Sequence, residues 1–411
     1  MLSLSIATLC AGLLAFNSVN GVLALSDGAA RLPAMGFNSW IPYGCGVNED
    51  NVFSNAQAIK STGLQALGYS YVNIDDCYAQ SNRNSNGDIL EDATRFKSGM
   101  KTLTDKIHGL GLKAGIFADA GTLTCQGYPG SFGKETQDAK QLIATWGFDY
   151  VKYADCNPPA DNTARTNVRG RFENMRNAIA QSSKAVNKKV VLSLVEFGNH
   201  SPWQWATDVG HSWRIIETDG PNWGYITSTL NRAAFITQAT NFDGRNDLDM
   251  LQIGNSGLSI DEQKTHFTAW ALTKSPLLIG TDLTKINSDS LNILKNKELI
   301  DINQDNQIGT SISPLHWGNK PDWTNDSNNP PQIWSGPTKD GVVFMFINTE
   351  DQTKDFSVSI TDSAWISNGR KYSVRDLWAH SDAGTTSGQL TAKSVPRHGV
   401  AAFLLKDAGN A

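Results

Sequence analysis

The chain has 411 residues, of which 40% are hydrophobic and 18% are charged, and its net charge is −5. This length exceeds that of one small domain, and the composition is that of a folded protein rather than a disordered one. The acidic balance, without a basic patch or lysine-rich tract, argues against nucleic acid and against an acidic membrane surface as partners.

The N-terminus has the pattern of a secretory signal. Residues 2–16 are apolar and small, and residues 21–24 place small or branched side chains where a signal peptidase cleaves. We expect cleavage near Ala24, which makes residues 1–24 a signal peptide and the protein secreted and extracellular. A buried N-terminal strand is the alternative. No later apolar run reaches about 18 residues, so no membrane span is expected.

Strand-like and helix-like segments alternate from Met35 to Asn296. The predicted strands are 35–40, 69–74, 113–117, the stretch 148–156, 189–195, 212–216, 247–251 and 276–279. The predicted helices are 48–67, 100–110, 135–146, 165–186, 225–238, 261–273 and 288–296. Eight such alternations predict a (β/α)₈ TIM barrel over residues 25–305. In the doubly wound alternative a glycine-rich turn follows the first strand. The candidate glycine-rich turn, Gly109-x-Gly111-x-x-x-Gly115, instead follows a predicted helix and precedes a predicted strand, which is the wrong order for this alternative.

The pattern changes after Asp305. Helical periodicity stops, turn residues gather at 323–331, and short alternating runs follow at 342–347, 356–360, 372–377 and 400–405. These features predict an antiparallel β-sandwich domain over residues 306–411.

Four cysteines remain after the signal, namely Cys45, Cys77, Cys125 and Cys156. An even number in a secreted chain predicts two disulfides, and four cysteines allow three pairings. Cys77 and Cys156 follow strand ends whereas the other two lie in loops, which favours Cys45–Cys77 and Cys125–Cys156. No Cys-x-x-Cys and no ligand-like histidine pair supports the competing metal site, so neither metal nor cofactor is expected.

Polar side chains stand at nearly every predicted strand end, where the ligands of parallel barrels bind. They could be structural ion pairs that close the barrel top. So many on one face instead favour a cleft for a hydroxyl-rich ligand, with Trp40 against the sugar's apolar face. The chemistry indicates a carbohydrate-active barrel, a glycosidase with two carboxylates. The strand-end residues are Asp75, Asp76, Asp119, Lys152, Asp155, Glu196, Arg214, Glu217 and Asp249.

Six ordered motifs resemble the α-galactosidases of glycoside hydrolase family 27, the secreted fungal branch most of all. The resemblance covers residues 32–305 and, more loosely, the β domain. It implies a barrel with a C-terminal β-sandwich, a retaining mechanism on terminal α-galactose, and the disulfide pairing favoured above. The motifs are Gly36-Phe37-Asn38-Ser39-Trp40, residues 71–77 (YVNIDDC), residues 124–131 (TCQGYPGS), residues 146–153 (WGFDYVKY), residues 246–251 (NDLDML) and residues 274–283 (KSPLLIGTDL).

The resemblance also assigns roles. Asp75, Asp76, Lys152, Arg214 and Asp249 match positions that hydrogen-bond galactose hydroxyls. Trp40 matches the aromatic residue that lines the pocket. Glu196 falls in the stretch that contacts the sugar's 2-position.

Two positions depart from the family pattern. The family's nucleophile stretch resembles Lys-Tyr-Asp-Asn-Cys, whereas residues 152–156 place Ala154 at the nucleophile position. The acid/base aspartate of the family, four residues after the strand-six arginine, is Thr218 here. Asp155 and Glu217 are the neighbouring carboxylates that can stand in for them.

Two function hypotheses follow. The first is an α-galactosidase-like hydrolase that acts on terminal α-galactose through the neighbouring carboxylates. The second is a galactoside-binding homologue with weak or no catalysis. Both take an α-galactoside carbohydrate as partner, and neither specifies an oligomeric state. The sequons that begin at Asn199 and Asn325 are candidate glycosylation sites.

Overall fold

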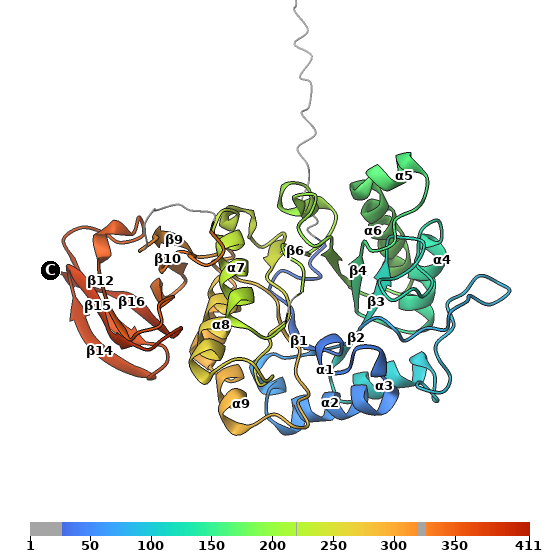
Figure 1. Cartoon of the computed structure of the whole chain (residues 1–411), viewed down its shortest axis with the longest axis horizontal. Coiled ribbons are helices and arrows are strands. Elements are labelled where there is room, and N and C mark those ends of the chain that lie inside the picture. The colour runs from blue at the N-terminus through green and yellow to red at the C-terminus, as the bar shows by residue number, and fades with distance from the viewer. Residues whose placement is uncertain (1–26, 219, 319–325) are drawn as a thin grey trace, which may run out of the picture.

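The computed structural model describes residues 27–218, 220–318 and 326–411 (Figure 1). The signal peptide predicted at 1–24 and the sequon residue Asn325 lie outside these ranges. None of the helices in the described ranges combines the length and apolar character needed to cross a membrane.

Eight parallel strands curl into the predicted (β/α)₈ barrel, which confirms the fold class. They are hydrogen-bonded in the order β7-β6-β5-β4-β3-β2-β1-β8. A parallel bridge between Leu251 and Ile279 closes the ring beyond β7. The strands are β1 (Met35–Asn38), β2 (Tyr71–Ile74), β3 (Lys113–Asp119), β4 (Tyr150–Ala154), β5 (Val191–Val195), β6 (Ser212–Arg214), β7 (Arg245–Asp247) and β8 (Leu277–Ile279).

Helices follow the strands and cover the barrel, and polar side chains mark where several begin. Asn48 and Ser259 form capping boxes at the starts of α2 and α8, and the Asn222 side chain caps α7. The helices are α1 (Trp40–Tyr43), α2 (Glu49–Ser61), α3 (Met100–Gly109), α4 (Glu135–Ala139), α5 (Asn162–Thr166), α6 (Val168–Ala185), α7 (Trp223–Ala234), α8 (Ile260–Leu272), α9 (Ser288–Leu294) and α10 (Lys297–Asn303).

Several boundaries differ from the sequence prediction. The helix predicted at 165–186 is two helices, because Asn167 leaves helical geometry and caps Gly170 with its side chain. The helix predicted at 135–146 continues from α4 as a π-helical stretch, Lys140–Thr145. The strand predicted at 247–251 ends at Asp247, because Asp249 has a positive φ of 79° that breaks extended geometry.

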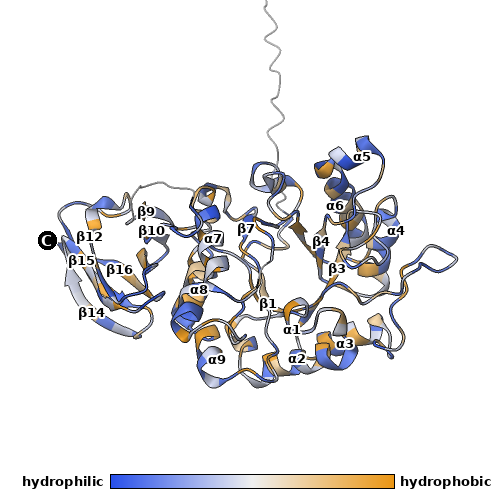
Figure 2. Cartoon of the chain, in the orientation of Figure 1, coloured by the Kyte–Doolittle hydropathy of each residue, from blue (hydrophilic) through white to orange (hydrophobic). Residues whose placement is uncertain are grey.

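The barrel interior below the strand ends is filled by side chains. A buried cluster of Ala34, Tyr71, Tyr150, Val191, Met250 and Leu278 occupies it. The rings of Tyr71 and Tyr150 meet edge to face with centroids 5.5 Å apart. Figure 2 shows the mixed hydrophobic and hydrophilic character of the helices that surround the barrel. The packed interior leaves the carboxyl ends of the strands as the place for a ligand.

The C-terminal domain is antiparallel and β-rich, as predicted. A six-stranded sheet has the order β14-β13-β16-β11-β10-β9, and β12 pairs with β15. Phe344, Phe346, Phe356, Phe403 and Leu405 belong to its buried core. The strands are β9 (Ser313–His316), β10 (Ile333–Thr338), β11 (Gly341–Ile347), β12 (Lys354–Ser359), β13 (Arg370–Asp376), β14 (Ser381–Thr386), β15 (Gln389–Val395) and β16 (Val400–Asn410).

The β domain docks on α8 beside the barrel (Figure 1), and Arg375 of β13 pairs with Glu298 of α10 at 2.9 Å. The Thr265 hydroxyl donates to the carbonyl of His398 at 2.7 Å, and the His398 imidazole pairs with Glu262 at 2.6 Å. The His398 ring also stacks on Trp223, with centroids 4.2 Å apart. Because Trp223 begins α7, the β domain supports the segment that follows β6.

Both predicted disulfides, Cys45–Cys77 and Cys125–Cys156, are present. They join residues 32 and 31 positions apart in the sequence. Closing loops of this length stabilises the folded state by about 3–4 kcal/mol each in the chain-entropy model. Each bond ties the residue after a strand end to a neighbouring loop, so the disulfides fix the rim of the barrel.

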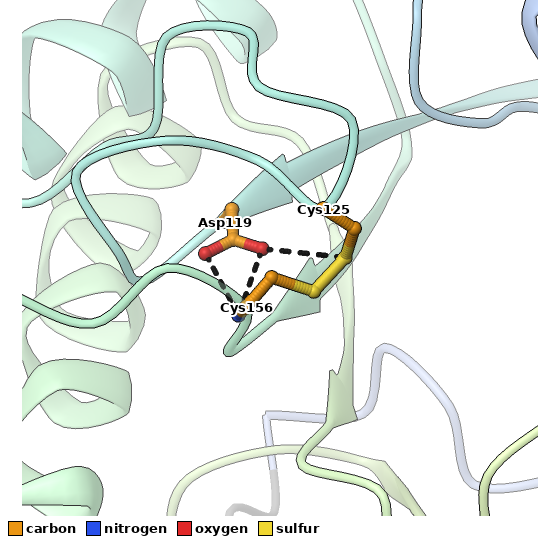
Figure 3. Close-up of side chains that lie close together, drawn as sticks. All are labelled: Asp119, Cys125 and Cys156. Carbon is orange, nitrogen blue, oxygen red and sulfur yellow. Dashed lines mark hydrogen bonds between the residues drawn. A yellow bond between two sulfur atoms is a disulfide. The ribbon is translucent and has the colours of Figure 1, made fainter.

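Asp119 lies behind the second disulfide as a buried carboxyl group (Figure 3). It accepts hydrogen bonds from the backbone amides of Gly121 at 2.7 Å and Cys156 at 3.2 Å. Its oxygens and the sulfurs of Cys125 and Cys156 lie close together, but both sulfurs are bonded to each other and are not thiolate ligands. Burial raises the pKa of Asp119 to about 7, since its amide donors only partly offset the lost hydration.

This raised pKa predicts a pH dependence of stability. The folded state holds the Asp119 proton between the ordinary pKa of 3.8 and about 7, whereas the unfolded state releases it. The free energy of unfolding therefore falls across this window as pH rises, by at most about 1.4 kcal/mol per pH unit. Chemical denaturation at pH 5 and pH 7.5 should show a smaller fall for Asp119→Asn than for the wild type.

The exposed Asp105, paired with Lys101 on α3, provides the control substitution Asp105→Asn. An equal pH dependence in the wild type and Asp119→Asn would show that Asp119 titrates near its ordinary pKa.

Candidate functional site

A cavity of about 260 Å³ opens at the carboxyl ends of strands β1 to β6. The sequence-predicted residues Trp40, Asp75, Asp76, Lys152 and Arg214 all line it, as do the two departing positions, Ala154 and Thr218. Its remaining lining residues are Phe117, Cys125, Cys156, Val195, Phe197 and Glu217.

Asp75 anchors the polar side of the cavity. Its Oδ2 accepts hydrogen bonds from Lys152 Nζ at 2.6 Å and Asn38 Nδ2 at 2.8 Å. Its backbone amide donates to the Ser39 hydroxyl at 2.9 Å. The Asp75 side chain is 3% exposed, so the ammonium group of Lys152 compensates a nearly buried charge.

Asp76 follows Asp75 and is held by backbone donors. The amide of Cys77 donates to Oδ1 at 2.7 Å, and the amide of Gln126 donates to Oδ2 at 3.0 Å. Burial raises the pKa of Asp76, and these hydrogen bonds partly lower it again. Because Cys77 belongs to one disulfide and Gln126 follows Cys125 of the other, the bridges fix the direction of this carboxyl group.

Arg214 supplies the second cation of the polar side. Its Nη1 lies 2.9 Å from Asp249 Oδ1, and its Nη2 donates to the Thr218 hydroxyl at 2.9 Å. The hydroxyl of Tyr225 donates to the other Asp249 oxygen at 2.8 Å. Asp249 is absent from the lining of the 260 Å³ cavity and faces a narrow space inside the barrel. It contacts the cavity through Arg214.

The two predicted stand-in carboxylates have different positions. Asp155 makes a two-point ion pair with Arg171 of α6, whose Nη2 lies 2.9 Å from Asp155 Oδ2. Arg171 also donates to the carbonyl of Ala164 at 3.1 Å, and both side chains are nearly buried. Asp155 is not part of the cavity lining, whereas Glu217 lines the cavity and is exposed to solvent.

Glu196, expected near the sugar's 2-position, lies beside the cavity rather than in its lining. Its Oε1 accepts from the backbone amide of His200 at 2.7 Å and pairs with the His200 ring. Burial raises the pKa of Glu196, and the hydrogen bond to the His200 side chain lowers it in part. The next residue, Phe197, lines the cavity in its place.

The site-residue prediction omitted an apolar side of the cavity. Phe117, Val195 and Phe197 line it together with the disulfide Cys125–Cys156. The Lys152 ammonium group lies 5.5 Å from the centroid of the Phe117 ring. Phe117 lies two residues before Asp119, and residues two apart on a strand face the same side. This spacing placed Phe117 on the inner face of β3. Phe197 lines the cavity from beyond the end of β5, where strand alternation no longer applies, and has a positive φ of 60°.

Comparisons with known proteins identify the family of the chain. The family described as alpha galactosidase A matches residues 33–305, and the family described as the alpha galactosidase C-terminal beta sandwich domain matches residues 328–405. The chain is 37% identical to a probable alpha-galactosidase B of Talaromyces emersonii, over 93% of this chain and 94% of that protein.

Two solved structures have the same architecture. The α-galactosidase I of Mortierella vinacea superposes with a TM-score of 0.84 and 33% identity, over 94% of this chain and all of that one. The α-galactosidase of Saccharomyces cerevisiae with raffinose superposes with a TM-score of 0.83 and 26% identity, over 94% and 100% of the two chains. The chain therefore belongs to the α-galactosidase family, glycoside hydrolase family 27.

Proposed function

We propose that the cavity binds the non-reducing terminal α-D-galactose of an oligosaccharide or polysaccharide, and that the chain is a glycoside hydrolase of the α-galactosidase type. The polar side of the cavity carries this proposal. Asp75 and Asp76 accept hydrogen bonds from sugar hydroxyls, while Lys152 and Arg214 donate to hydroxyl oxygens. The raffinose in the yeast structure supports an oligosaccharide as ligand.

Aromatic rings complete the proposed sugar site. Trp40 lines the same cavity and is the proposed platform for the apolar face of the sugar, and Phe117 and Phe197 are further aromatic lining residues. Asp249 acts from below the cavity by orienting the Arg214 guanidinium group, 2.9 Å away. Glu196 acts through the turn that carries Phe197.

Hydrolysis in this chain needs a route other than a nucleophile at position 154. Ala154 presents only a methyl group to the cavity, and the Thr218 hydroxyl is occupied by Arg214. Of the two neighbouring carboxylates we propose Glu217 as the one that acts, because the Asp155 carboxylate is taken up by Arg171. An inverting route would use Glu217 as the base that takes a proton from a water molecule beside Ala154, and it would need a second carboxyl group about 6.5–9.5 Å away to protonate the leaving oxygen.

A galactoside-binding protein without catalysis is the second candidate. The observation that favours it is local: neither position 154 nor position 218 carries a carboxylate. The comparisons give this alternative no support, since the relatives from Talaromyces emersonii and Mortierella vinacea are both named as α-galactosidases. Measured turnover separates the two candidates, because both keep the same sugar-binding groups.

We also propose that the protein is secreted after cleavage near Ala24 and carries a glycan at Asn199. Two disulfides support an oxidising compartment, and Asn199 is exposed. We retain residues 25–305 and 306–411 as the two domains, which the family matches at 33–305 and 328–405 support.

Replacing Asp76 tests the sugar site. Asp76→Ala removes a charge-assisted hydrogen-bond acceptor from the cavity. It should weaken galactose binding by about 1–3 kcal/mol, or roughly 5–150-fold in Kd. Isothermal titration calorimetry measures this loss, with Asp105→Ala as a control carboxylate on the outer surface of α3. Unchanged affinity in Asp76→Ala would mean that galactose binds elsewhere.

Restoring both carboxylates tests the catalytic proposal. A single general acid contributes about 10²–10⁴ in rate, and a nucleophile opens the covalent route. The double variant Ala154→Asp, Thr218→Asp should therefore hydrolyse an aryl α-galactoside several orders of magnitude faster than the wild type.

Glu217→Gln in the wild-type background should abolish the remaining turnover, while Asp155→Asn should leave the route through Glu217 in place. Rapid hydrolysis by the wild type with retained configuration, unaffected by Glu217→Gln, would contradict the assignment of these positions.

A further inference from the structure

We infer that His200 is a positioning residue of the sugar site: its pairing with Glu196 closes a turn that holds the Phe197 ring against the cavity. This inference deepens the proposed function, because it names what determines the apolar side of the proposed galactose pocket. It concerns the turn of residues 196–200, which directly follows β5.

The side chain of Glu196, at the start of the turn, binds His200 at its end. Glu196 is the first residue after β5, and its Oε1 accepts the backbone amide of His200 at 2.7 Å as well as the His200 ring nitrogen Nδ1. The amide of Asn199 also donates to the carbonyl of Glu196 at 3.3 Å. These contacts connect residues 196 and 200, with Phe197 between them.

Phe197 has a backbone conformation that it would not adopt by itself. Its φ is 60°, a left-handed value that is unfavourable for a non-glycine residue. Gly198 follows with a φ of 77°, and a Cβ atom there would lie 2.2 Å from the carbonyl oxygen of Ile215. The turn is therefore pressed against the segment after β6, and the surrounding contacts must hold it in place.

Glu196 has few other ways to satisfy its charge. Its side chain is 1% exposed, whereas that of His200 is 57% exposed. Among the described residues, no hydrogen-bond partner reaches the second oxygen, Oε2. Without the His200 ring, a buried carboxylate would keep one amide donor, which is a costly arrangement that favours rearrangement of the turn.

The far side of the turn is anchored to the barrel. The indole nitrogen of Trp205 donates to the carbonyl of His200 at 3.0 Å. The Trp205 ring packs on Phe172 of α6, with centroids 5.9 Å apart. The Trp205 contact therefore fixes the backbone of His200, and the His200 ring fixes the Glu196 carboxylate. Phe197 lies between these two constraints and lines the cavity.

The test is a thermodynamic cycle in the full chain with methyl α-D-galactoside as the probe, measured by calorimetry. His200→Ala should raise the Kd about 10-fold, the effect of displacing one aromatic contact. Phe197→Ala should raise the Kd by a similar factor. If His200 acts through Phe197, adding His200→Ala to Phe197→Ala should change the Kd no further.

Two controls separate positioning from general destabilisation. His200→Gln retains a hydrogen-bond donor for Glu196 and should restore most of the wild-type affinity. His316→Ala removes a partly exposed histidine of the β domain that pairs with Asp362 at 2.9 Å, and it should leave the Kd unchanged. None of these variants alters Asn199 or Ser201, so the sequon and any glycan on it are retained.

A crystal structure of His200→Ala provides a readout that needs no ligand. We expect Phe197 to leave its positive φ and its ring to leave the cavity. A Phe197 that keeps both, or an equal effect of His200→Ala in the wild-type and Phe197→Ala backgrounds, would overturn the inference. Failure of the wild type to bind the galactoside would instead overturn the proposed function, and the crystal structure would still decide the role of His200.

Discussion

The ion pair between Lys152 and Asp75 is the interaction on which the sugar site depends. Two parallel strands, β2 and β4, deliver opposite charges to the same edge of the barrel, 2.6 Å apart. Without Lys152, the nearly buried carboxylate of Asp75 would lack a cation, and its position could not be maintained at low cost. Asn38 from β1 adds a neutral donor to the same oxygen at 2.8 Å. Three strands are thereby coupled at the floor of one cavity.

A second buried ion pair determines what the cavity presents at the end of β4. Successive residues of a strand face opposite sides, so either residue 154 or residue 155 can point inward. The bidentate contact with Arg171 draws Asp155 outward, and Ala154 faces the cavity. Because Arg171 of α6 holds Asp155 away from the cavity, the end of β4 presents only the Ala154 methyl group to the anomeric side of the proposed site. This is the physical basis for proposing that hydrolysis proceeds through Glu217, which lines the cavity, rather than through Asp155.

The sequence predicted the parts of the fold that rest on periodicity. Eight strands were located because their apolar runs alternate with helical patterns. Asp75 and Asp76, which directly follow β2, and Lys152, within β4, line one cavity. Strand β14 was missed, since its residues Ser381–Thr386 are almost all exposed and carry no apolar alternation. Helix α10 (Lys297–Asn303), which begins shortly after α9 ends at Leu294, was also missed.

Side-chain directions beyond the strand ends could not be predicted from the sequence. Glu196 and Asp155 both follow strands, yet each turns toward a local partner, His200 and Arg171 respectively. The positive φ of Phe197 depends on contacts made by residues on other elements. Such choices are decided by tertiary contacts that a linear pattern does not contain.

The most direct test of the central claim compares two sugars that differ only at the 4-hydroxyl group. Calorimetry of the unmodified protein should detect binding of methyl α-D-galactoside and a Kd for methyl α-D-glucoside that is about 10–100-fold higher. The reason is that the epimer leaves a buried acceptor of the polar side without its hydroxyl donor. Equal affinity for the two sugars, or no binding of the galactoside, would contradict the account.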